Sequence, residues 1–219
     1  GVVDAIDFLT ASNRRGYDED PGEDAALHAK GRSVVVIGGG DTAMDCVRTS
    51  IRQGAEKVTC VYRRDRANMP GSRQEVYNAE EEGANFEWLA APEEFLGEST
   101  VEGVKVLKMR LGAPDATGRR SIEGTGQHSI IEGDLVIRAL GFDPEDLPGQ
   151  WQQPELAVTR WGTLTVPPGG FQTSLPGVFA GGDIVRGASL VVWAIKDGRD
   201  AADAIHLSLT ETLALEAAE

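Results

Sequence analysis

The sequence is poor in cysteine and histidine. It has two cysteines, Cys46 and Cys60, with no CxxC pair, and its three histidines stand far apart in the chain. A disulfide framework is therefore excluded, and a reducing compartment is favoured. No two histidines have the spacing of metal ligands, and no Ser/His/Asp grouping is evident. Because both cysteines lie in apolar stretches, we expect them to be small core residues.

The sequence also has few basic residues, with 21 lysines and arginines against 35 acidic residues and a net charge of -14. Nucleic-acid binding needs a basic face, so we expect no nucleic-acid partner. No apolar run approaches the ~20 residues of a membrane-spanning helix. The first residues lack the basic and apolar regions of a signal peptide. We therefore expect no membrane partner and a cytoplasmic location.

The chain begins with glycine rather than methionine, inside an amphipathic pattern. Val3, Ile6 and Leu9 recur at helical spacing, which predicts a helix over about residues 3–12. The polar segment 14–31 is typical of a surface connection. This opening suggests a piece of a longer protein.

The segment from Ser33 to Arg64 reads as strand, helix and strand. Residues 32–37 are a β-branched run typical of a buried parallel strand. Residues 41–53 predict a helix ended by Gly54, and residues 57–64 predict a second strand. Together they form one βαβ unit of about 30 residues.

Further elements follow this unit. Ser72 and Glu75 form a capping box, which predicts the start of a helix that Gly83 ends. Strands are predicted at 84–90 and 135–140, with two more between them that are joined by a turn at 114–118. The pattern indicates an α/β fold, in which an antiparallel hairpin is layered on an open parallel sheet.

The composition changes after Gly141, where proline and glycine become frequent. We expect a domain boundary near Phe142. A short strand is predicted within 174–184, followed by one long helix from about Ser189. Its apolar face includes Ile195, Ala202, Ile205 and Leu209.

Three consecutive glycines lie between the first strand and helix of the βαβ unit. Gly38, Gly40 and Ala43 match the pattern G-x-G-x-x-[GA], in which the glycines allow a tight turn and close approach of a diphosphate. The helix start presents free N–H groups to phosphates. The alternative is a tight turn without a ligand. The βαβ context favours a Rossmann-like dinucleotide site.

The end of the second strand bears on which dinucleotide binds. NAD sites usually place an acid about 20 residues after the glycines, to hold the ribose 2′-hydroxyl. Here Tyr62 takes that position, and Arg63 and Arg64 follow. Guanidinium groups suit the 2′-phosphate of NADP. A solvated basic turn is the alternative, and it is a fair one for Arg66. The pattern favours NADPH over NADH.

A second motif, "TSLPGVFAGGDI", ends at an acid before the long helix. The Asp183 carboxylate could accept hydrogen bonds from a sugar-like hydroxyl, or cap a loop. The start of the last helix, near Leu190 to Val192, could face an electron-rich atom.

Three stretches together, "GGGDTAMD", "YRRDRANMPGS" and "VFAGGDIVRGASLVVWAIKDGRDAA", carry a family resemblance. The chain resembles the small (beta) subunit of NADPH-dependent glutamate synthase over nearly its whole length. This subunit belongs to the two-dinucleotide-domain flavoproteins, which include thioredoxin reductase. The redox CxxC of thioredoxin reductase is absent here.

The resemblance implies site residues for two cofactors, NADPH and FAD. Residues 38–42 would wrap the NADPH diphosphate, which assigns Gly38, Gly39, Gly40, Asp41 and Thr42. Arg63 and Arg64 would clamp the 2′-phosphate, and Asp45 would lie near the nicotinamide. Gly141 ends the return strand to the flavin domain, where Leu140 replaces a threonine. Gly182 and Asp183 would contact the ribityl and diphosphate region of FAD, and N–H groups near Val191 would face the isoalloxazine ring.

The resemblance also implies a division into domains. Residues 1–30 would be a helix and linker from a truncated FAD domain, 31–141 the NADPH-binding domain, and 142–219 the C-terminal half of the FAD-binding domain. The glycine fingerprint of the FAD domain and the cysteines for iron–sulfur clusters are missing. We therefore expect a complete NADPH site and an incomplete FAD site.

The function implied by the resemblance is electron transfer. Hydride would pass from NADPH to FAD, and electrons would continue through iron–sulfur clusters to the large (alpha) subunit of glutamate synthase. Two alternatives remain. One is an NADPH-dependent flavoprotein that serves another acceptor, such as a pyrimidine reductase or a ferredoxin-linked enzyme. The other is a non-catalytic module for nucleotide binding or docking.

Overall fold

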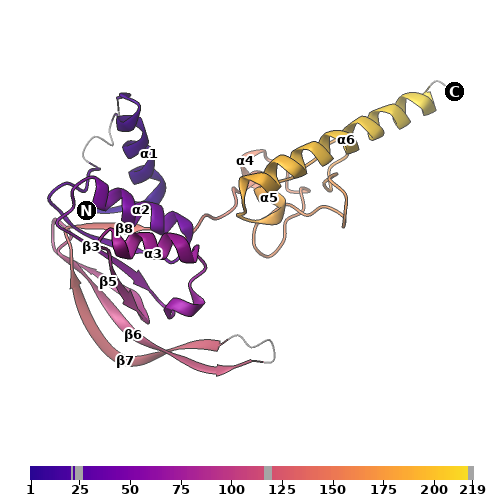
Figure 1. The fold of residues 1–219 in the computed structure, drawn as a ribbon. Helices are drawn as coiled ribbons and strands as arrows, with labels where there is room; N and C mark the ends of the chain where they lie inside the picture. Colours follow the sequence, from indigo (N-terminus) through magenta and orange to yellow (C-terminus); the bar gives the residue numbers. More distant parts are fainter. Residues whose placement is uncertain (21, 23–26, 116–119, 217–219) are drawn as a thin grey trace. The chain divides into compact units, whose positions relative to one another are not determined.

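The computed structural model describes residues 1–20, 22, 27–115 and 120–216 (Figure 1). The chain divides into two compact units, Gly1–Gly141 and Phe142–Glu219. Within the described ranges, no helix combines the length and apolar character that a bilayer crossing requires.

The first unit is built on a parallel sheet. Its five strands have the order β1-β8-β2-β3-β4, and every neighbouring pair is parallel. The chain runs outward from β2 through β3 to β4, and then returns to the other side of β2 as β8. Their bounds are Val2–Asp4 (β1), Ser33–Ile37 (β2), Lys57–Tyr62 (β3), Asn85–Trp88 (β4) and Leu135–Arg138 (β8).

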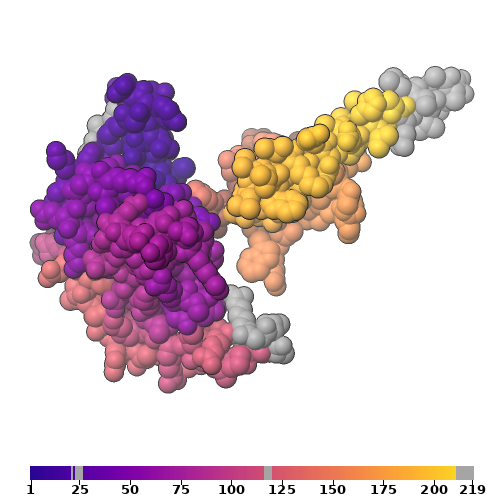
Figure 2. All heavy atoms as spheres, in the orientation of Figure 1, coloured from indigo at the N-terminus to yellow at the C-terminus, as the bar shows by residue number. Residues whose placement is uncertain are grey.

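Three helices belong to this unit: α1 (Ala5–Gly16), α2 (Asp41–Arg52) and α3 (Arg73–Glu81). The helices α2 and α3 lie side by side and contact each other (Figures 1 and 2). The apolar face of α2 packs on the sheet, because small and medium side chains recur there at helical spacing. These fully buried side chains are Ala43, Met44, Cys46 and Val47.

The N-terminal segment differs from its prediction. Val2–Asp4 form a strand paired with β8, so the helix expected over 3–12 begins at Ala5 and extends to Gly16. Phe8 of this helix is fully buried in the same core as β2. The segment 1–30, which the resemblance assigned to a truncated FAD domain, thus lies in the first unit. Residues 21 and 23–26 of the predicted connection lie outside the described residues.

A second sheet covers the other face of the parallel sheet. It consists of the antiparallel strands β5 (Ala90–Leu96), β6 (Gly103–Pro114) and β7 (Arg120–Glu132). The two-residue period of β2 accounts for both layers. Val34 and Val36 belong to the helix-side core, whereas Val35 and Ile37 pack with Val104 and other residues of the second sheet.

The structure therefore confirms the α/β fold, with a parallel sheet and an antiparallel layer. The antiparallel layer has three strands rather than the two of a hairpin, because β5 pairs with β6 beside β7. Of the turn predicted at 114–118, residues 116–118 lie outside the described part of the chain.

The second unit contains α4 (Leu147–Gln150), α5 (Asp183–Arg186) and α6 (Val191–Glu216). The strand predicted within 174–184 is reduced to a single bridge between Gln172 and Phe179. Leu156 and Leu164 are buried, but the predicted apolar face of α6 is not packed within this unit. Its exposed large side chains include Ile195, Ile205 and Leu209.

Candidate nucleotide-binding site

A cavity of about 650 Å³ opens where β2, β3 and β8 end. In parallel sheets, ligands bind at the carboxyl ends of the strands, where neighbouring connections leave in opposite directions. Here β2 lies at such a point, because the connection after β2 leads to β3 on one side while β8 pairs with β2 on the other side. The cavity brings together six residues that the sequence predicted: Gly38, Gly39, Gly40, Thr42, Arg63 and Gly141.

Gly38 turns the chain tightly at the end of β2. A Cβ atom at this position would lie 2.2 Å from the carbonyl oxygen of Ala139, which no side chain tolerates. The Gly38 N–H donates to the Val61 carbonyl at 3.1 Å, and the Gly38 carbonyl accepts from the Cys60 thiol at 3.4 Å. The turn is therefore held by two hydrogen bonds with β3 and lies closely against Ala139, the residue after β8.

Gly39 lies against the ring of Tyr62. A Cβ atom on Gly39 would come within 2.4 Å of that ring. The Tyr62 hydroxyl donates to the carbonyl of Asn68 at 3.1 Å, and its ring meets Trp88 edge to face. The position where an NAD site would carry an acid thus supports the glycine loop with an aromatic ring.

Gly40 precedes α2 and leaves the start of this helix open. A Cβ atom there would find no atom within 4 Å. Gly40 is the N-cap residue, and no side chain in the described part of the chain caps this end. The first N–H groups of a helix lack partners within it, and they carry the positive end of its dipole. The open end of α2 is therefore suited to an anion.

The three arginines after β3 have different surroundings. Arg63 is exposed and lines the cavity with the glycines. Arg64 instead lines a separate hollow of about 350 Å³ beside Pro114 and the start of β7. Arg66, at the start of the single-turn helix η2 (Arg66–Asn68), pairs with Glu80 through two hydrogen bonds of 2.6 and 2.7 Å. The expected clamp of two guanidinium groups is thus divided, and only Arg63 reaches the cavity.

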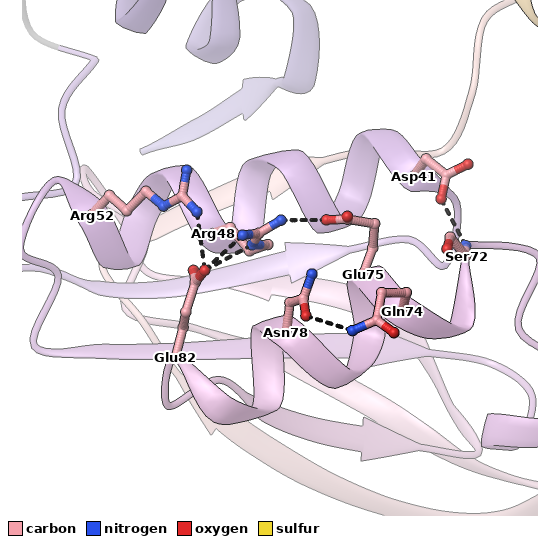
Figure 3. Close-up of polar contacts among 8 residues, drawn as sticks. All are labelled: Asp41, Arg48, Arg52, Ser72, Gln74, Glu75, Asn78 and Glu82. Atoms are coloured by element: carbon pink, nitrogen blue, oxygen red, sulfur yellow. Dashed lines mark hydrogen bonds and ion pairs between the residues drawn. The ribbon is translucent and has the colours of Figure 1, made fainter.

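Asp41 does not line the cavity, although the resemblance placed it at the diphosphate. Its Oδ1 atom accepts a hydrogen bond of 2.7 Å from the backbone N–H of Ser72 (Figure 3). Next to it, the N–H of Gly71 donates to the carbonyl of Gly39 at 2.9 Å. These contacts join "GGGD" to "MPGS" across 31 residues and were not predicted from the sequence.

The helix α3 begins at the predicted place but without the predicted capping box. Ser72 is the N-cap residue, yet its side chain makes no cap hydrogen bond. Glu75 instead pairs with Arg48 of α2, which also binds Glu82 at the end of α3 (Figure 3). An ion pair between two helices has replaced the local contact.

This ion-pair network lowers the pKa of the Glu82 carboxyl, chiefly through the hydrogen bond from Arg48 and also through Arg52. One oxygen of Glu82 is buried without a partner among the described residues, so its charge depends on these arginines. The stability that Glu82 contributes is present above its ordinary pKa near 4.5 and is lost as the pH falls through the lowered value.

Replacing Arg48 by methionine is expected to lower the melting temperature by a few degrees at pH 7, because Glu75 loses its arginine and Glu82 keeps only Arg52. The difference from the unchanged protein should shrink as the pH falls below the ordinary pKa of Glu82. Thermal unfolding followed by circular dichroism between pH 7 and 3 measures both effects. Arg52→Met is the matched control, because the exposed Arg52 side chain makes a single contact with Glu82; an equal loss in both variants would contradict this account.

Asp45 lies one turn into α2, exposed and away from the cavity lining. Partial desolvation raises its pKa, and the carboxylates of Glu75 and Asp41 add to this effect. Asp45 lies near Glu75 of α3, and its expected place near the nicotinamide stays a prediction.

Both cysteines are fully buried, as the sequence predicted. Burial raises the pKa of the Cys46 and Cys60 thiols to about 12, which keeps them protonated and unreactive at neutral pH. No group of three potential metal ligands is found within the described ranges.

The remaining predicted residues lie in the second unit. Asp183 lines a cavity of about 590 Å³ together with Trp161 and Phe142. Gly182 has a φ of 74°, and its N–H donates to the Asp197 carboxylate at 3.2 Å. Val191 begins α6 and is exposed, but it does not line this cavity.

Asp197 is a buried acid of α6 that the sequence analysis did not single out. Its carboxylate accepts two hydrogen bonds from the guanidinium of Arg186, which lowers its pKa. Because the same carboxylate accepts from the N–H of Gly182, this amide is already bonded within the protein. The ion pair of Asp197 with Arg186 therefore fixes the turn at Gly182. Asp183 follows this turn as the first residue of α5.

The family model of the pyridine nucleotide-disulphide oxidoreductases matches residues 10–198, and the chain belongs to this family. It is 63% identical over 212 residues to a putative glutamate synthase [NADPH] small chain of Cereibacter sphaeroides. It is 59% identical over 210 residues to the glutamate synthase [NADPH] small chain of Azospirillum brasilense. These matches cover 94% of this chain but only 50% and 43% of the two relatives, so the chain spans about half of their length.

A solved structure shares the fold. Mycobacterium tuberculosis FprA in complex with NADPH superposes with a TM-score of 0.75 and 19% identity, covering 99% of this chain and 60% of that one. This likeness shows that the two chains share a Rossmann-like fold.

Proposed function

We propose that this chain binds NADPH in the cavity of its first unit, as the nucleotide-binding part of an oxidoreductase of the glutamate synthase small-chain type. One observation carries the proposal. The glycine turn, the open end of α2 and the guanidinium of Arg63 line or border one cavity, which holds no acid at the end of β3.

The residues fit the parts of the dinucleotide. Gly38 to Gly40 and the start of α2 would hold the diphosphate. Gly38 and Gly39 allow the tight turn against Ala139 and Tyr62, and Gly40 leaves open space at the start of the helix. Arg63 would bind the 2′-phosphate at one end of the cavity. At the other end, Leu140 and Gly141 would border the nicotinamide.

When bound, NADPH supplies a hydride from its nicotinamide ring and FAD accepts it. Such a transfer needs no acid or base from the protein, so the task of the side chains is to orient the rings and shield them from water. For FAD, the second unit offers Asp183, the turn at Gly182 and the N–H groups near Val191. We propose that the other FAD-binding residues correspond to the part of the small-chain relatives' sequences that this chain does not match.

The proposed partner follows from the names of the relatives. Electrons would pass through iron–sulfur clusters to the large (alpha) subunit of glutamate synthase, in the cytoplasm and without nucleic acid or membrane. The small-chain relatives, at 63% and 59% identity, support this assignment.

The test is titration calorimetry of the 219-residue chain with NADPH and with NADH. We expect NADPH to bind at least about tenfold more tightly, the equivalent of one charged hydrogen bond to the 2′-phosphate. Equal affinities would contradict the NADPH assignment, and no binding of either nucleotide would contradict the site itself. Parallel titration with FAD tests the second unit separately.

A further inference from the structure

The four residues Met69–Ser72, here called the 69–72 loop, lie directly on the glycine loop. The contact is backbone to backbone, since the N–H of Gly71 donates to the Gly39 carbonyl at 2.9 Å. Gly71 is buried, and a Cβ atom there would lie 3.1 Å from that same oxygen. The 69–72 loop therefore fits closely over Gly39, and a Cβ atom at Gly71 would press on the Gly39 carbonyl.

This contact fixes the direction of one peptide plane. In a trans peptide the C=O of one residue and the N–H of the next point in opposite directions. Because the carbonyl of Gly39 points at Gly71, the N–H of Gly40 must point away from the 69–72 loop. Gly40 lines the cavity, and its N–H is one of the donors that a diphosphate would use.

Asp41 fastens the adjacent residue of the loop. Its Oδ1 atom accepts from the Ser72 N–H at 2.7 Å, so both residues of the Gly71–Ser72 pair are held by the segment that opens α2 (Figure 3). The bond to Ser72 gives this carboxylate a structural role but leaves its negative charge in place. The positive end of α2 stabilises that charge.

Two further contacts hold the 69–72 loop from its ends. On one side, the Tyr62 hydroxyl binds the carbonyl of Asn68. On the other side, Arg48 of α2 grips Glu75 and Glu82, which keeps α3 against α2. The loop is thus supported at both ends, and Asp41 bonds its last residue, Ser72, next to the start of α3.

We propose that Asp41 is a positioning residue for the dinucleotide site, which acts by fastening the 69–72 loop so that the Gly39–Gly40 peptide presents its N–H to the diphosphate. The inference rests on the proposed function, because it concerns the same cavity. It changes the role of Asp41 from a residue that contacts the diphosphate to one that orients the backbone donors.

The test compares four variants of the 219-residue chain by titration with NADP⁺, NAD⁺ and adenosine 2′-monophosphate. Asp41→Ala removes the acceptor, and Gly71→Ala pushes against Gly39 from the other side. Each should weaken the binding of NADP⁺ and of NAD⁺ by about the same factor. The loss is roughly tenfold for Asp41→Ala, which removes a charged hydrogen bond. It is smaller for Gly71→Ala, which introduces only a close contact with the Gly39 carbonyl. Adenosine 2′-monophosphate has no diphosphate, so its affinity should stay unchanged.

Asp41→Asn distinguishes the hydrogen bond that Asp41 accepts from the negative charge that it carries. An amide oxygen can still accept from the Ser72 N–H, so this variant should keep the affinity for NADP⁺ or raise it. Asp7→Ala is the control, because Asp7 is also an exposed acid in the first turn of a helix, α1, and does not line the cavity. Its nucleotide affinities should not change.

The outcomes are distinguishable. If Asp41→Ala and Gly71→Ala bind NADP⁺ as the unchanged chain does, the positioning role is wrong, although the NADPH site stands. If Asp41→Asn weakens binding as much as Asp41→Ala, the charge itself matters and the positioning role is also wrong. If the unchanged chain binds no NADP⁺, the proposed function fails first.

Discussion

Replacing Arg63 by alanine is expected to weaken NADPH binding by about 10- to 100-fold, the range given by a charged hydrogen bond of about 1.5–3 kcal/mol. NADH binding should stay the same, because it lacks the 2′-phosphate. The reason is positional: among the arginines after β3, Arg63 is the one that lines the cavity beside the glycine turn. Fluorescence titration of the reduced nucleotides gives both affinities directly.

Two neighbouring arginines provide matched controls for this experiment. Arg64→Ala removes the same charge from a separate hollow, and Arg66→Ala removes one that is already paired with Glu80. Both should change NADPH affinity by less than threefold, through long-range charge alone. A loss in Arg64→Ala equal to that in Arg63→Ala would show that the two guanidinium groups act together after all.

The divergence of Arg63 and Arg64 has a simple physical cause. The strand β3 ends at Tyr62, and the chain bends at Arg63 and Arg64, so the two side chains line different cavities. The carbonyl of Arg64 accepts from the N–H of Leu89, the residue after β4, at 3.0 Å. The sequence places both arginines directly after the strand, but it does not show this bend, so it could not tell which of the two lines the cavity.

Local patterns predicted much of the first unit correctly. The β-branched run at 33–37 formed a strand, and the amphipathic segment after it formed α2 from Asp41 to Arg52. Both are decided by neighbours in the sequence, through periodicity and the glycines that end each element. The glycine turn was predictable for the same reason, because its steric demand is local.

Elements whose partners lie far along the chain were not predictable in this way. The strand β1 forms because Val2–Asp4 pair with β8, more than 130 residues away, and this pairing overrides the helical spacing. The capping box gave the right start for α3, but Glu75 found a stronger partner in Arg48. In each case a tertiary contact replaced the local one that the pattern implied.

The same limit applied to the site. Asp41 follows the glycines directly, so its assignment to the diphosphate was natural from the sequence. Its partner Ser72 lies 31 residues away, and only the packing of α3 on α2 brings the two together. The spacing of residues along α2 gives no information about contacts with a second helix. The bond from Asp41 to the start of α3 therefore could not be predicted from the sequence.

Replacing Gly40 by alanine is expected to reduce nucleotide binding by about 100-fold or more while leaving the fold intact. A Cβ atom at Gly40 projects into open space, so no protein atom has to move. That open space lies at the start of α2, where the diphosphate must approach the backbone closely. The loss should be the same for NADPH and NADH, unlike the loss caused by Arg63→Ala.

Gly38→Ala and Gly16→Ala complete this experiment. At Gly38 a Cβ atom would collide with the Ala139 carbonyl at 2.2 Å, so this variant should lose stability by about 1–3 kcal/mol, the usual cost of overpacking. Gly16 ends α1, has no atom near its Cβ position and does not line the cavity, so its variant should keep both stability and binding. Chemical denaturation and titration of all three separate the two effects. Normal nucleotide affinity in Gly40→Ala would mean that the diphosphate does not lie at the start of α2, and the cavity would then need another ligand.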